Sequence, residues 1–595
     1  MIATATSDQQ QHALLLLVRK CIDRQEREQM YQANGVHVLA ELVNRSESYI
    51  TRLYALKSLG WVADGDSRLT ESAFYELRDS VREATPQELD SLAEVLQHGS
   101  EQEKGDGAVL CASIATRGQL DALRDVGVLP PLIEMLKGGT ALQTLWAANA
   151  LGTLACNADE IRVAIALEGG IPPLVALLRV GTAEQSHQAA RALGKLAKES
   201  GNVAAIVDQG AISPLVALVR SGTDEQKRFA AYALGNLADN EEIRAAIAGE
   251  GAISPMAALL QAGTDVQKEE AAYAVGKLAI HNDANSAAFA LEGAISSLVV
   301  LVRTGTDAQK QWAVYALRQL AHNDENCAAI SREDGIPALV ALLQGGTVEQ
   351  SQEAASLIRE GTDDQKLNAA YALGTLSFEN EENSETIGRE GAVSPLVALL
   401  QTGSDGQKVF AAYALGLLAV TNEWNRTAIG REDAISPLVA LLRAGTWQQK
   451  EIAAFSLGNL AAANSANSDA ISREGAISLL VTLLQEGSDK QKRLAACALS
   501  NLADNDANRA AIAREEGISP LVALLRGGTD EQKEVAACAF GNLAIDKKAG
   551  STAIVRGVVP PLVALVRTGT NPQKERAAFA LMHLANSDDE NLWDS

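Results

Sequence analysis

Apolar and polar positions follow a pattern along this chain that returns every 41 or 42 residues, with one exception. One apolar phrase opens with glycine and carries a proline near its start, as in Gly210–Leu218 (G-A-I-S-P-L-V-A-L). A second phrase, Ala230–Ala238 (A-A-Y-A-L-G-N-L-A), follows each copy at a fixed distance. The proline place of the first phrase falls at Pro131, Pro173, Pro214, Pro255, Ser297, Ala338, Pro395, Pro437, Leu479, Pro520 and Pro561. A period of this length predicts an array of helical repeats rather than one globular core.

Each unit is predicted to contain three helices. A short helix over Ile243–Ile247 runs toward Gly251, a residue suited to the left-handed turn that ends a helix. A second helix has Pro255 in its first turn, where the missing N–H group costs nothing. Thr264 and Gln267 then form a capping box, in which a hydroxyl and an amide three residues later cap a third helix.

The capping box supplies an independent count of the third helices. Twelve boxes occur in phase with the apolar pattern, beginning at Thr140, Thr182, Thr223, Thr264, Thr306, Thr347, Thr362, Ser404, Thr446, Ser488, Thr529 and Thr570. Ser100 with Glu103 is a degraded thirteenth. The small residues of the second phrase, Gly235 among them, are expected to face a neighbouring unit and allow close stacking. Because no unit could bury its faces alone, the stack itself is the predicted core.

Composition narrows the class of protein. Only 4% of residues are aromatic, which favours closely spaced helices over β-sheets. The formal charge of −24 argues against nucleic acid as a partner and against docking on anionic lipid. The apolar run Ala13–Val18 is too short to span a bilayer, so no direct membrane insertion is expected. The six scattered cysteines form no C-x-x-C pair, which indicates a reducing compartment: the cytoplasm, with the nucleus as the alternative.

No catalytic or metal-binding constellation emerges from the sequence. The seven histidines include no H-E-x-x-H motif, and His281 and His322 hold equivalent repeat positions. The Gly-Lys pairs lie inside predicted helices, which excludes a phosphate-binding loop. We therefore expect no enzyme, no cofactor and no metal site.

A short helix followed by two longer ones in about 42 residues, carrying these two phrases, resembles the armadillo family, in the superfamily of β-catenin and importin-α. The resemblance covers about residues 125–586 and implies an all-α, right-handed α-α superhelix. Residues 1–124 resemble it more weakly, as degenerate repeats and a cap, and residues 587–595 are an acidic tail. HEAT repeats are the neighbouring alternative, but their two-helix units lack the short first helix. The layout is most similar to the fungal vacuolar armadillo adaptor; that adaptor is lipid-anchored, and Ile2 stands here where its acceptor glycine would be.

One unit departs from the period. Thr347 and Thr362 are only 15 residues apart, so about 26 residues are missing relative to a full repeat. Residues 347–361 are therefore predicted to be a truncated repeat between two arrays, 125–346 and 362–586. Two interpretations stay open here: a hinge or change of superhelix direction, and a lost exon or gene-model gap.

The resemblance also implies a binding surface. In this family the third helices line a concave groove for an extended peptide, with an aromatic residue and an asparagine four positions apart on one helix face. The aromatic place holds Tyr54, Tyr232, Tyr273, Tyr315, Tyr371, Tyr413, Phe455 and Phe579, and it changes to Asn149, Arg191, Cys497 and Cys538. The asparagine place holds Asn236, Asn459, Asn501 and Asn542, and elsewhere Ser58, Thr153, Lys195, Lys277, Gln319, Thr375, Leu417 and His583. The alternative is that the tyrosines only cap the core.

The predicted groove residues are Arg191, Lys195, Tyr232, Asn236, Tyr273, Lys277, Tyr315, Gln319, Tyr371, Tyr413, Phe455, Asn459, Asn501, Asn542 and Phe579. Tryptophan, which importin-α uses at nearly every aromatic place, is missing from this set, and a basic autoinhibitory segment is missing too, so a receptor for basic signals is not expected. Three cationic groove positions instead suit an acidic ligand segment. We expect a non-catalytic adaptor or scaffold that binds extended or disordered segments of other proteins. The alternatives are a nucleocytoplasmic cargo receptor and a substrate-recruiting subunit of a ubiquitin ligase; the oligomeric state stays open.

Overall fold

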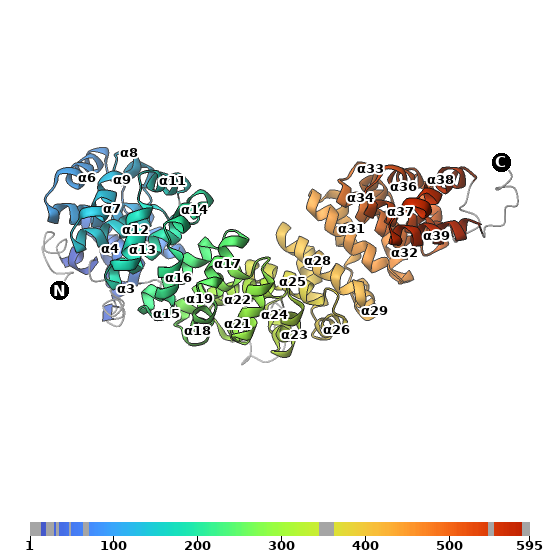
Figure 1. Cartoon of the computed structure of the whole chain (residues 1–595), viewed down its shortest axis with the longest axis horizontal. Helices are drawn as coiled ribbons and strands as arrows, with labels where there is room; N and C mark the ends of the chain where they lie inside the picture. Colours follow the sequence, from blue (N-terminus) through green and yellow to red (C-terminus); the bar gives the residue numbers. More distant parts are fainter. Residues whose placement is uncertain are drawn as a thin grey trace. The chain divides into compact units, whose positions relative to one another are not determined.

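The computed structural model describes residues 13–18, 29–30, 35–46, 49–62, 71–156, 158–343, 362–544 and 552–585. Helices joined by short turns account for this part of the chain, which contains no β-strand (Figure 1). The chain divides into two compact units, Met1–Leu298 and Val299–Ser595, with the boundary inside α21 (Ala294–Thr304). The prediction of an all-α repeat fold is confirmed.

In the first unit, successive third helices lie side by side, each in contact with the next. They are α4 (Tyr49–Val62), α7 (Glu101–Arg117), α10 (Ala141–Leu154), α13 (Ala183–Leu196), α16 (Asp224–Leu237) and α19 (Asp265–Ala279). The first and second helices are α3 (Gly35–Arg45), α5 (Glu71–Ser80), α6 (Pro86–His98), α8 (Leu120–Asp125), α9 (Leu129–Gly138), α11 (Asp159–Leu167), α12 (Ile171–Val180), α14 (Ser200–Asp208), α15 (Ile212–Ser221), α17 (Glu241–Gly249), α18 (Ile253–Ala262) and α20 (Asp283–Leu291).

The second unit repeats this arrangement, again with each third helix against the next. Its third helices are α22 (Asp307–Leu320), α25 (Asp363–Ser377), α28 (Asp405–Thr421), α31 (Trp447–Ala461), α34 (Asp489–Leu502), α37 (Asp530–Leu543) and α39 (Asn571–Ala585). Its first and second helices are α23 (Asp324–Arg332), α24 (Gly335–Leu343), α26 (Glu381–Arg389), α27 (Val393–Thr402), α29 (Glu423–Arg431), α30 (Ile435–Ala444), α32 (Ser465–Arg473), α33 (Ala476–Glu486), α35 (Asp506–Arg514), α36 (Ile518–Gly527) and α38 (Thr552–Thr568).

Capping boxes begin the third helices as predicted. Eleven of the twelve boxes form, and the one at Thr347 lies outside the described residues. Ser100 and Glu103 cap α7 in the same way. Each box satisfies two backbone N–H groups that a helix start would otherwise leave without partners.

The glutamine of the box also links one repeat to the previous one. In α37, Nε2 of the buried Gln532 donates a hydrogen bond of 2.9 Å to the carbonyl oxygen of Asp489, the first residue of α34. The equivalent pairs are Gln143–Glu101, Gln185–Ala141, Gln267–Asp224, Gln365–Asp307, Gln407–Asp363, Gln491–Trp447 and Gln573–Asp530. A glutamate could complete the capping box, but its carboxylate has no N–H group for this second bond.

Buried asparagines connect the first helices. Asn464 caps α32, and three residues later Asn467 donates from Nδ2 to the carbonyl oxygens of Leu460 and Arg426, at 3.0 and 2.9 Å. These acceptors lie at the end of α31 and in α29, so one side chain joins three helices. The N-x-x-N spacing recurs in five further first helices, starting at Asn282, Asn323, Asn380, Asn422 and Asn505.

The predicted truncated repeat, 347–361, lies outside the described residues. The helices on either side of it are described: α25 packs directly on α22, and Gln365 Nε2 donates to the carbonyl oxygen of Asp307 at 2.7 Å. The helix α24 packs on α25 in the way that α27 packs on α28, which are the second and third helices of one repeat. One complete repeat therefore runs from α23 to α25, and relative to the 41- or 42-residue period it carries about 15 additional residues.

Helix lengths follow the pattern with one exception. The last copy of the first phrase, with Pro561 at its proline place, predicts a second helix that starts near this proline. Instead α38 is continuous and contains both Pro560 and Pro561. Among the described residues no single helix is long and apolar enough to cross a membrane. Four pairs of consecutive helices are long and apolar enough only when the two helices are taken together, and the two helices of each pair are bent by 78–84° relative to each other.

The glutamine link generates a prediction. Changing Gln532→Glu keeps the capping acceptor but removes the inter-repeat donor and places a carboxylate beside the Asp489 side chain, whose Oδ1 lies 3.3 Å from Nε2. Because this position is buried, we expect a loss of about 1–3 kcal/mol in local stability. Hydrogen exchange of α37 amides measures it. The reverse change, Glu103→Gln in the exposed capping box of α7, is the control and should leave the exchange of α7 amides unchanged. If α37 amides in the Gln532→Glu variant also exchange as slowly as in the unmodified chain, the link is contradicted.

Candidate functional site

The predicted groove residues all lie on one side of the third helices, which we call the third-helix face. In the first unit this face carries Arg191 and Lys195 on α13, Tyr232 and Asn236 on α16, and Tyr273 and Lys277 on α19. In the second unit it carries Tyr315, Gln319, Tyr371, Tyr413, Phe455, Asn459, Asn501, Asn542 and Phe579. All of these side chains are partly buried except Phe579, which is exposed. None of them is sealed beneath another helix.

Four of the aromatic side chains pack on the glycine of the preceding third helix. A Cβ atom added to Gly235 would lie 2.9 Å from the ring of Tyr273. The same relation holds for Gly194 with Tyr232, Gly416 with Phe455 and Gly541 with Phe579. The rings are therefore partly core and partly open surface. This partial exposure is consistent with both interpretations of the tyrosines, and ligand binding at them stays a prediction.

In the second unit the rings form a continuous column. The ring centroids of Tyr371 and Tyr413 are 5.8 Å apart with planes inclined by 25°, and those of Tyr413 and Phe455 are 6.0 Å apart. The column ends at the next helix, where Cys497 takes the aromatic place. Cys538 takes the next aromatic place, so two successive third helices without a ring at this place separate Phe455 from Phe579.

An arginine that sequence analysis did not single out stands at the start of this column. Arg318 occupies the glycine place of α22, in the phrase A-V-Y-A-L-R-Q-L-A. Its guanidinium carbon lies 4.0 Å from the centroid of the Tyr371 ring, and Nη1 donates to Oδ1 of Asn368 at 2.9 Å. The guanidinium thus fills the space that a glycine leaves in other repeats, and a cation–π contact stabilises it there. The departure from glycine in the phrase is the signal that could have identified it.

The asparagines in the second unit hold the preceding third helix. Nδ2 of Asn459 donates to the carbonyl oxygen of Gly416 at 3.2 Å, and Nδ2 of Asn501 donates to that of Gly458 at 2.9 Å. Nδ2 of Asn542 donates to the carbonyl oxygen of Ser500 at 2.9 Å. A primary amide has two N–H donors and one carbonyl acceptor, so this bond leaves Asn459 and Asn501 with one donor and the acceptor for a ligand.

Asn236 in the first unit is engaged differently. Its Nδ2 donates to the carbonyl oxygen of Tyr232 in its own helix at 3.0 Å. Its Oδ1 accepts a hydrogen bond of 2.9 Å from the Tyr273 hydroxyl. Because both ends of this amide already have partners, it offers a ligand less than the asparagines of the second unit do.

Positive charge gathers on the third-helix face of the first unit. Burial lowers the pKa of Lys195 from its ordinary value, and the neighbouring cations Lys198 and Arg191 lower it further. Burial likewise lowers the pKa of Lys277. Lys57, on α4, is fully buried, and burial together with Arg191 lowers its pKa to about 7. Lys57 and Arg191 both donate to the Thr153 hydroxyl oxygen, at 3.2 and 3.5 Å.

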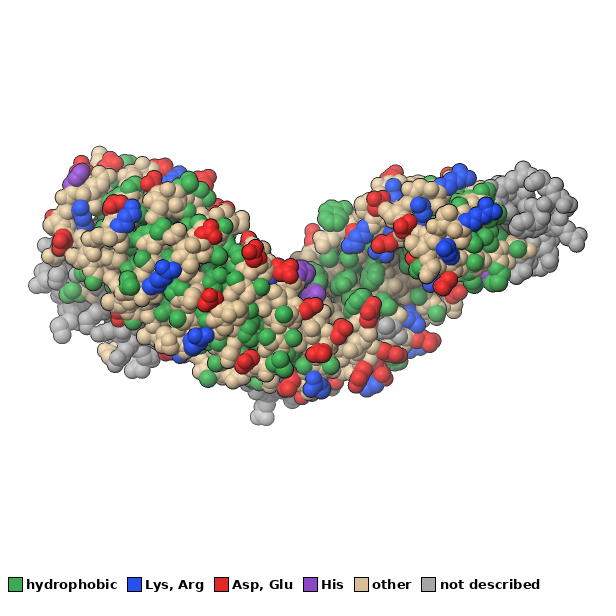
Figure 2. All heavy atoms as spheres, viewed as in Figure 1, with side chains coloured by type: hydrophobic (Ala, Val, Ile, Leu, Met, Phe, Trp, Pro, Cys, Tyr) green, Lys and Arg blue, Asp and Glu red, His purple; other side chains and the backbone are tan. Residues whose placement is uncertain are grey.

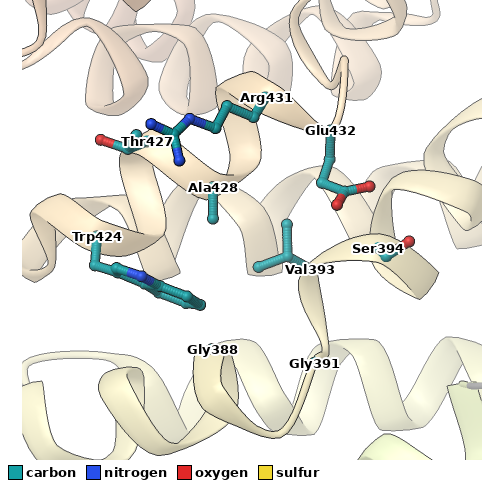
Figure 3. Close-up of a pocket in the computed structure, with 9 residues that line it drawn as sticks. All are labelled: Gly388, Gly391, Val393, Ser394, Trp424, Thr427, Ala428, Arg431 and Glu432. Atoms are coloured by element: carbon teal, nitrogen blue, oxygen red, sulfur yellow. The ribbon is translucent and has the colours of Figure 1, made fainter.

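A pocket of about 310 Å³ lies away from this face, on the first and second helices of the second unit (Figure 3). Trp424, Thr427, Ala428 and Arg431 of α29 form one wall, and Gly388 of α26 faces the indole from the opposite side. The remaining lining residues are Gly391, Val393, Ser394 and Glu432. A Cβ on Gly388 would lie 2.7 Å from the indole, so this glycine allows the tryptophan to lie across α26. Sequence analysis did not find this pocket.

Charged side chains are interspersed with apolar ones on the face of the molecule shown in Figure 2. Among the described residues there is no group of three or more histidine, cysteine, aspartate and glutamate side chains that could hold a metal ion. The chemistry available on the third-helix face is therefore that of recognition: amides, aromatic rings and ammonium or guanidinium groups.

Comparisons with known proteins agree with the repeat boundaries. A family model described as Armadillo/beta-catenin-like repeat matches residues 199–239, 464–504 and 505–545. Each match spans one first, one second and one third helix, ending with α16, α34 and α37 respectively. The crystal structure of an engineered protein, a target of the Northeast Structural Genomics Consortium, is similar with a TM-score of 0.59 at 28% identity, over 70% of this chain and 98% of that one. No curated protein sequence matches the chain.

The packing of rings on glycines predicts a coupled pair of substitutions. Gly235→Ala should reduce local stability by about 1–3 kcal/mol, because the new methyl group overlaps the Tyr273 ring. In a chain that already carries Tyr273→Ala, which has its own cost from the lost ring, the Gly235→Ala change should cost much less, since the overlap with the ring disappears. Hydrogen exchange of α16 and α19 amides measures both. Gly249→Ala is the matched control, because nothing lies within 4 Å of a Cβ there; a purely additive double variant would argue against the contact.

Lys57 predicts a pH dependence of stability. Its pKa in the folded chain is about 7, against an ordinary value of 10.5, so between these values the unfolded chain binds a proton that the folded chain does not. The contribution of this group to stability therefore rises with pH through that window. Lys57→Met should stabilise the first unit at pH 7, and this advantage should be about 2 kcal/mol smaller at pH 9. Hydrogen exchange of α7 and α10 amides at both pH values tests it, and an advantage that is independent of pH would refute the assignment.

Proposed function

We propose, on the premise that this chain is built of armadillo repeats, that it is a non-catalytic scaffold whose third-helix face binds extended segments of other proteins. Armadillo repeats generally mediate protein–protein interaction and are typically non-catalytic. A single observation carries the finer proposal. Asn459, Asn501 and Asn542 stand at the same place on three successive third helices, partly exposed and oriented by a hydrogen bond to the preceding helix.

An oriented amide suits the backbone of an extended segment. A peptide group presents one N–H and one C=O, and a side-chain amide can accept from the first and donate to the second. Such bonds do not depend on the side chains of the guest, so a row of them binds extended chains with little sequence preference. Orientation by the preceding helix lowers the conformational entropy that the asparagine would otherwise lose on binding.

The aromatic column supplies the second element of recognition. The rings of Tyr371, Tyr413 and Phe455 are partly exposed, and successive ring centroids lie 5.8 and 6.0 Å apart. Rings of this kind form walls for alkyl or cationic side chains of a guest. Because each ring is clamped against the preceding helix, the walls are already formed before a guest arrives.

Leu417 provides the control that the experiment needs. It stands at the asparagine place of α28 and is buried, so the fold accepts leucine at this place. The variant Asn501→Leu with Asn542→Leu should therefore keep the repeats folded while it removes two amides. Leu417→Asn does the opposite and extends the row to four asparagines on successive helices.

We expect the double leucine variant to recover at least about tenfold fewer clones from a display library of random 15-residue peptides. The reason is that each bound peptide loses two hydrogen bonds of about 1 kcal/mol each. Leu417→Asn should recover more clones than the unmodified chain. Thermal unfolding of each variant checks that the repeats remain folded. Recovery that is the same for all three folded chains would exclude the asparagine row as the binding site.

A further inference from the structure

Three basic side chains form a stripe along one helix of the first unit. Arg191, Lys195 and Lys198 are spaced four and three residues apart, the last of them just beyond the end of α13. Residues at this spacing share one face of a helix, so the three side chains follow each other over about 10 Å. The negative end of the helix dipole lies at the same point and favours cations there.

The stripe has no acidic side chain within ion-pair distance in the part of the chain that the structure describes. Among the described residues no ion pair involves Arg191, Lys195 or Lys198, although the chain carries 75 acidic and 51 basic side chains. The next third helix shows the contrast, since Arg228 lies 4.0 Å from Glu225 and 3.9 Å from Glu270. Glu270 acts electrostatically on Lys195, but it also lies 3.9 Å from Arg228, so the three neighbouring cations leave local positive charge open to a ligand.

The side chains of the stripe are held by their surroundings. The Lys195 ammonium nitrogen lies 4.9 Å from the centroid of the Tyr232 ring, and that of Lys198 lies 6.0 Å from it. Arg191 reaches the Thr153 hydroxyl, which also accepts from Lys57. One ring therefore contacts two ammonium groups, while the buried amine of Lys57 shares the Thr153 hydroxyl with Arg191. Lys195 is partly exposed and Lys198 fully so, which leaves both accessible to a ligand.

We propose that this stripe is a subsite for a phosphorylated serine or threonine side chain of a bound partner segment. The inference rests on the proposed function, since it assigns a ligand group to the same third-helix face. A phosphate monoester carries a charge of about −1.5 to −2 and three acceptor oxygens at neutral pH, whereas a carboxylate carries a single charge. The greater charge and the third oxygen let a phosphate pair with several of these cations more strongly than a carboxylate can. Nucleic acid is disfavoured because the stripe is limited to one helix of an acidic chain.

The first test uses small probes and the full chain. N-acetyl-phosphoserine N-methylamide, the corresponding aspartate and the corresponding serine are titrated at low salt and followed by ligand-observed NMR. We expect the phosphoserine probe to bind at least about tenfold more tightly than the aspartate probe. The variant Lys195→Gln with Lys198→Gln should reduce phosphoserine binding at least about tenfold. Equal affinities for phosphate and carboxylate, or binding that is insensitive to this variant, would overturn the proposal.

Two further arms separate this proposal from its premise. Lys277→Gln, at the equivalent place on α19, should change phosphoserine binding less than about twofold and controls for general charge. The Asn501→Leu and Asn542→Leu variant should bind the phosphoserine probe normally, because its changes lie in the second unit. If the unmodified chain captures library peptides but ignores the phosphoserine probe, the subsite is excluded while the scaffold function stands. A 20-nucleotide single-stranded DNA that binds with the same sensitivity to Lys195→Gln and Lys198→Gln would also overturn the assignment.

Discussion

The close approach of successive third helices is the constraint on which the rest of this structure depends. Ala230, Ala231 and Ala233 are completely buried, and Gly235 lies in contact with the ring of the next repeat. Larger side chains at these places would separate the helices and break the hydrogen bond between the box glutamine and the preceding helix. A three-helix unit of about 42 residues cannot bury enough apolar surface alone, so each repeat depends on its neighbours for its core.

The same contact shapes the candidate site. Tyr232, Tyr273, Phe455 and Phe579 each pack on a glycine of the previous third helix. Asn459, four residues after Phe455, donates to a carbonyl oxygen of that same previous helix. Stacking and recognition therefore share side chains, and a guest would meet groups that the fold has already oriented. This sharing explains why the rings are neither fully buried nor fully free.

The two units present different chemistry within one pattern. In the first unit, cations take places that hold a ring or an asparagine elsewhere, and Arg191 and Lys195 replace both on the same helix. In the second unit, rings or amides hold most of these places, and the cation Arg318 is engaged by Tyr371 and Asn368. The first unit thus offers charge, whereas the second offers backbone capture and aromatic walls.

The order of elements was readable from the chain alone, because capping boxes, prolines and glycines act locally and report helix ends wherever they occur. The 41- or 42-residue period and the three helices of a unit follow from such local signals, whereas the residues of the third-helix face were predicted from the family resemblance. Which partner each polar side chain takes was not readable, because the partners lie about 40 residues away and depend on how the helices pack. The second bond of the box glutamine, the engagement of Asn236 by Tyr273, the burial of Lys57 and the direct packing of α25 on α22 all belong to this class. Local chemistry sets where a helix starts and stops, while contacts between repeats decide which of its side chains remain open to a ligand.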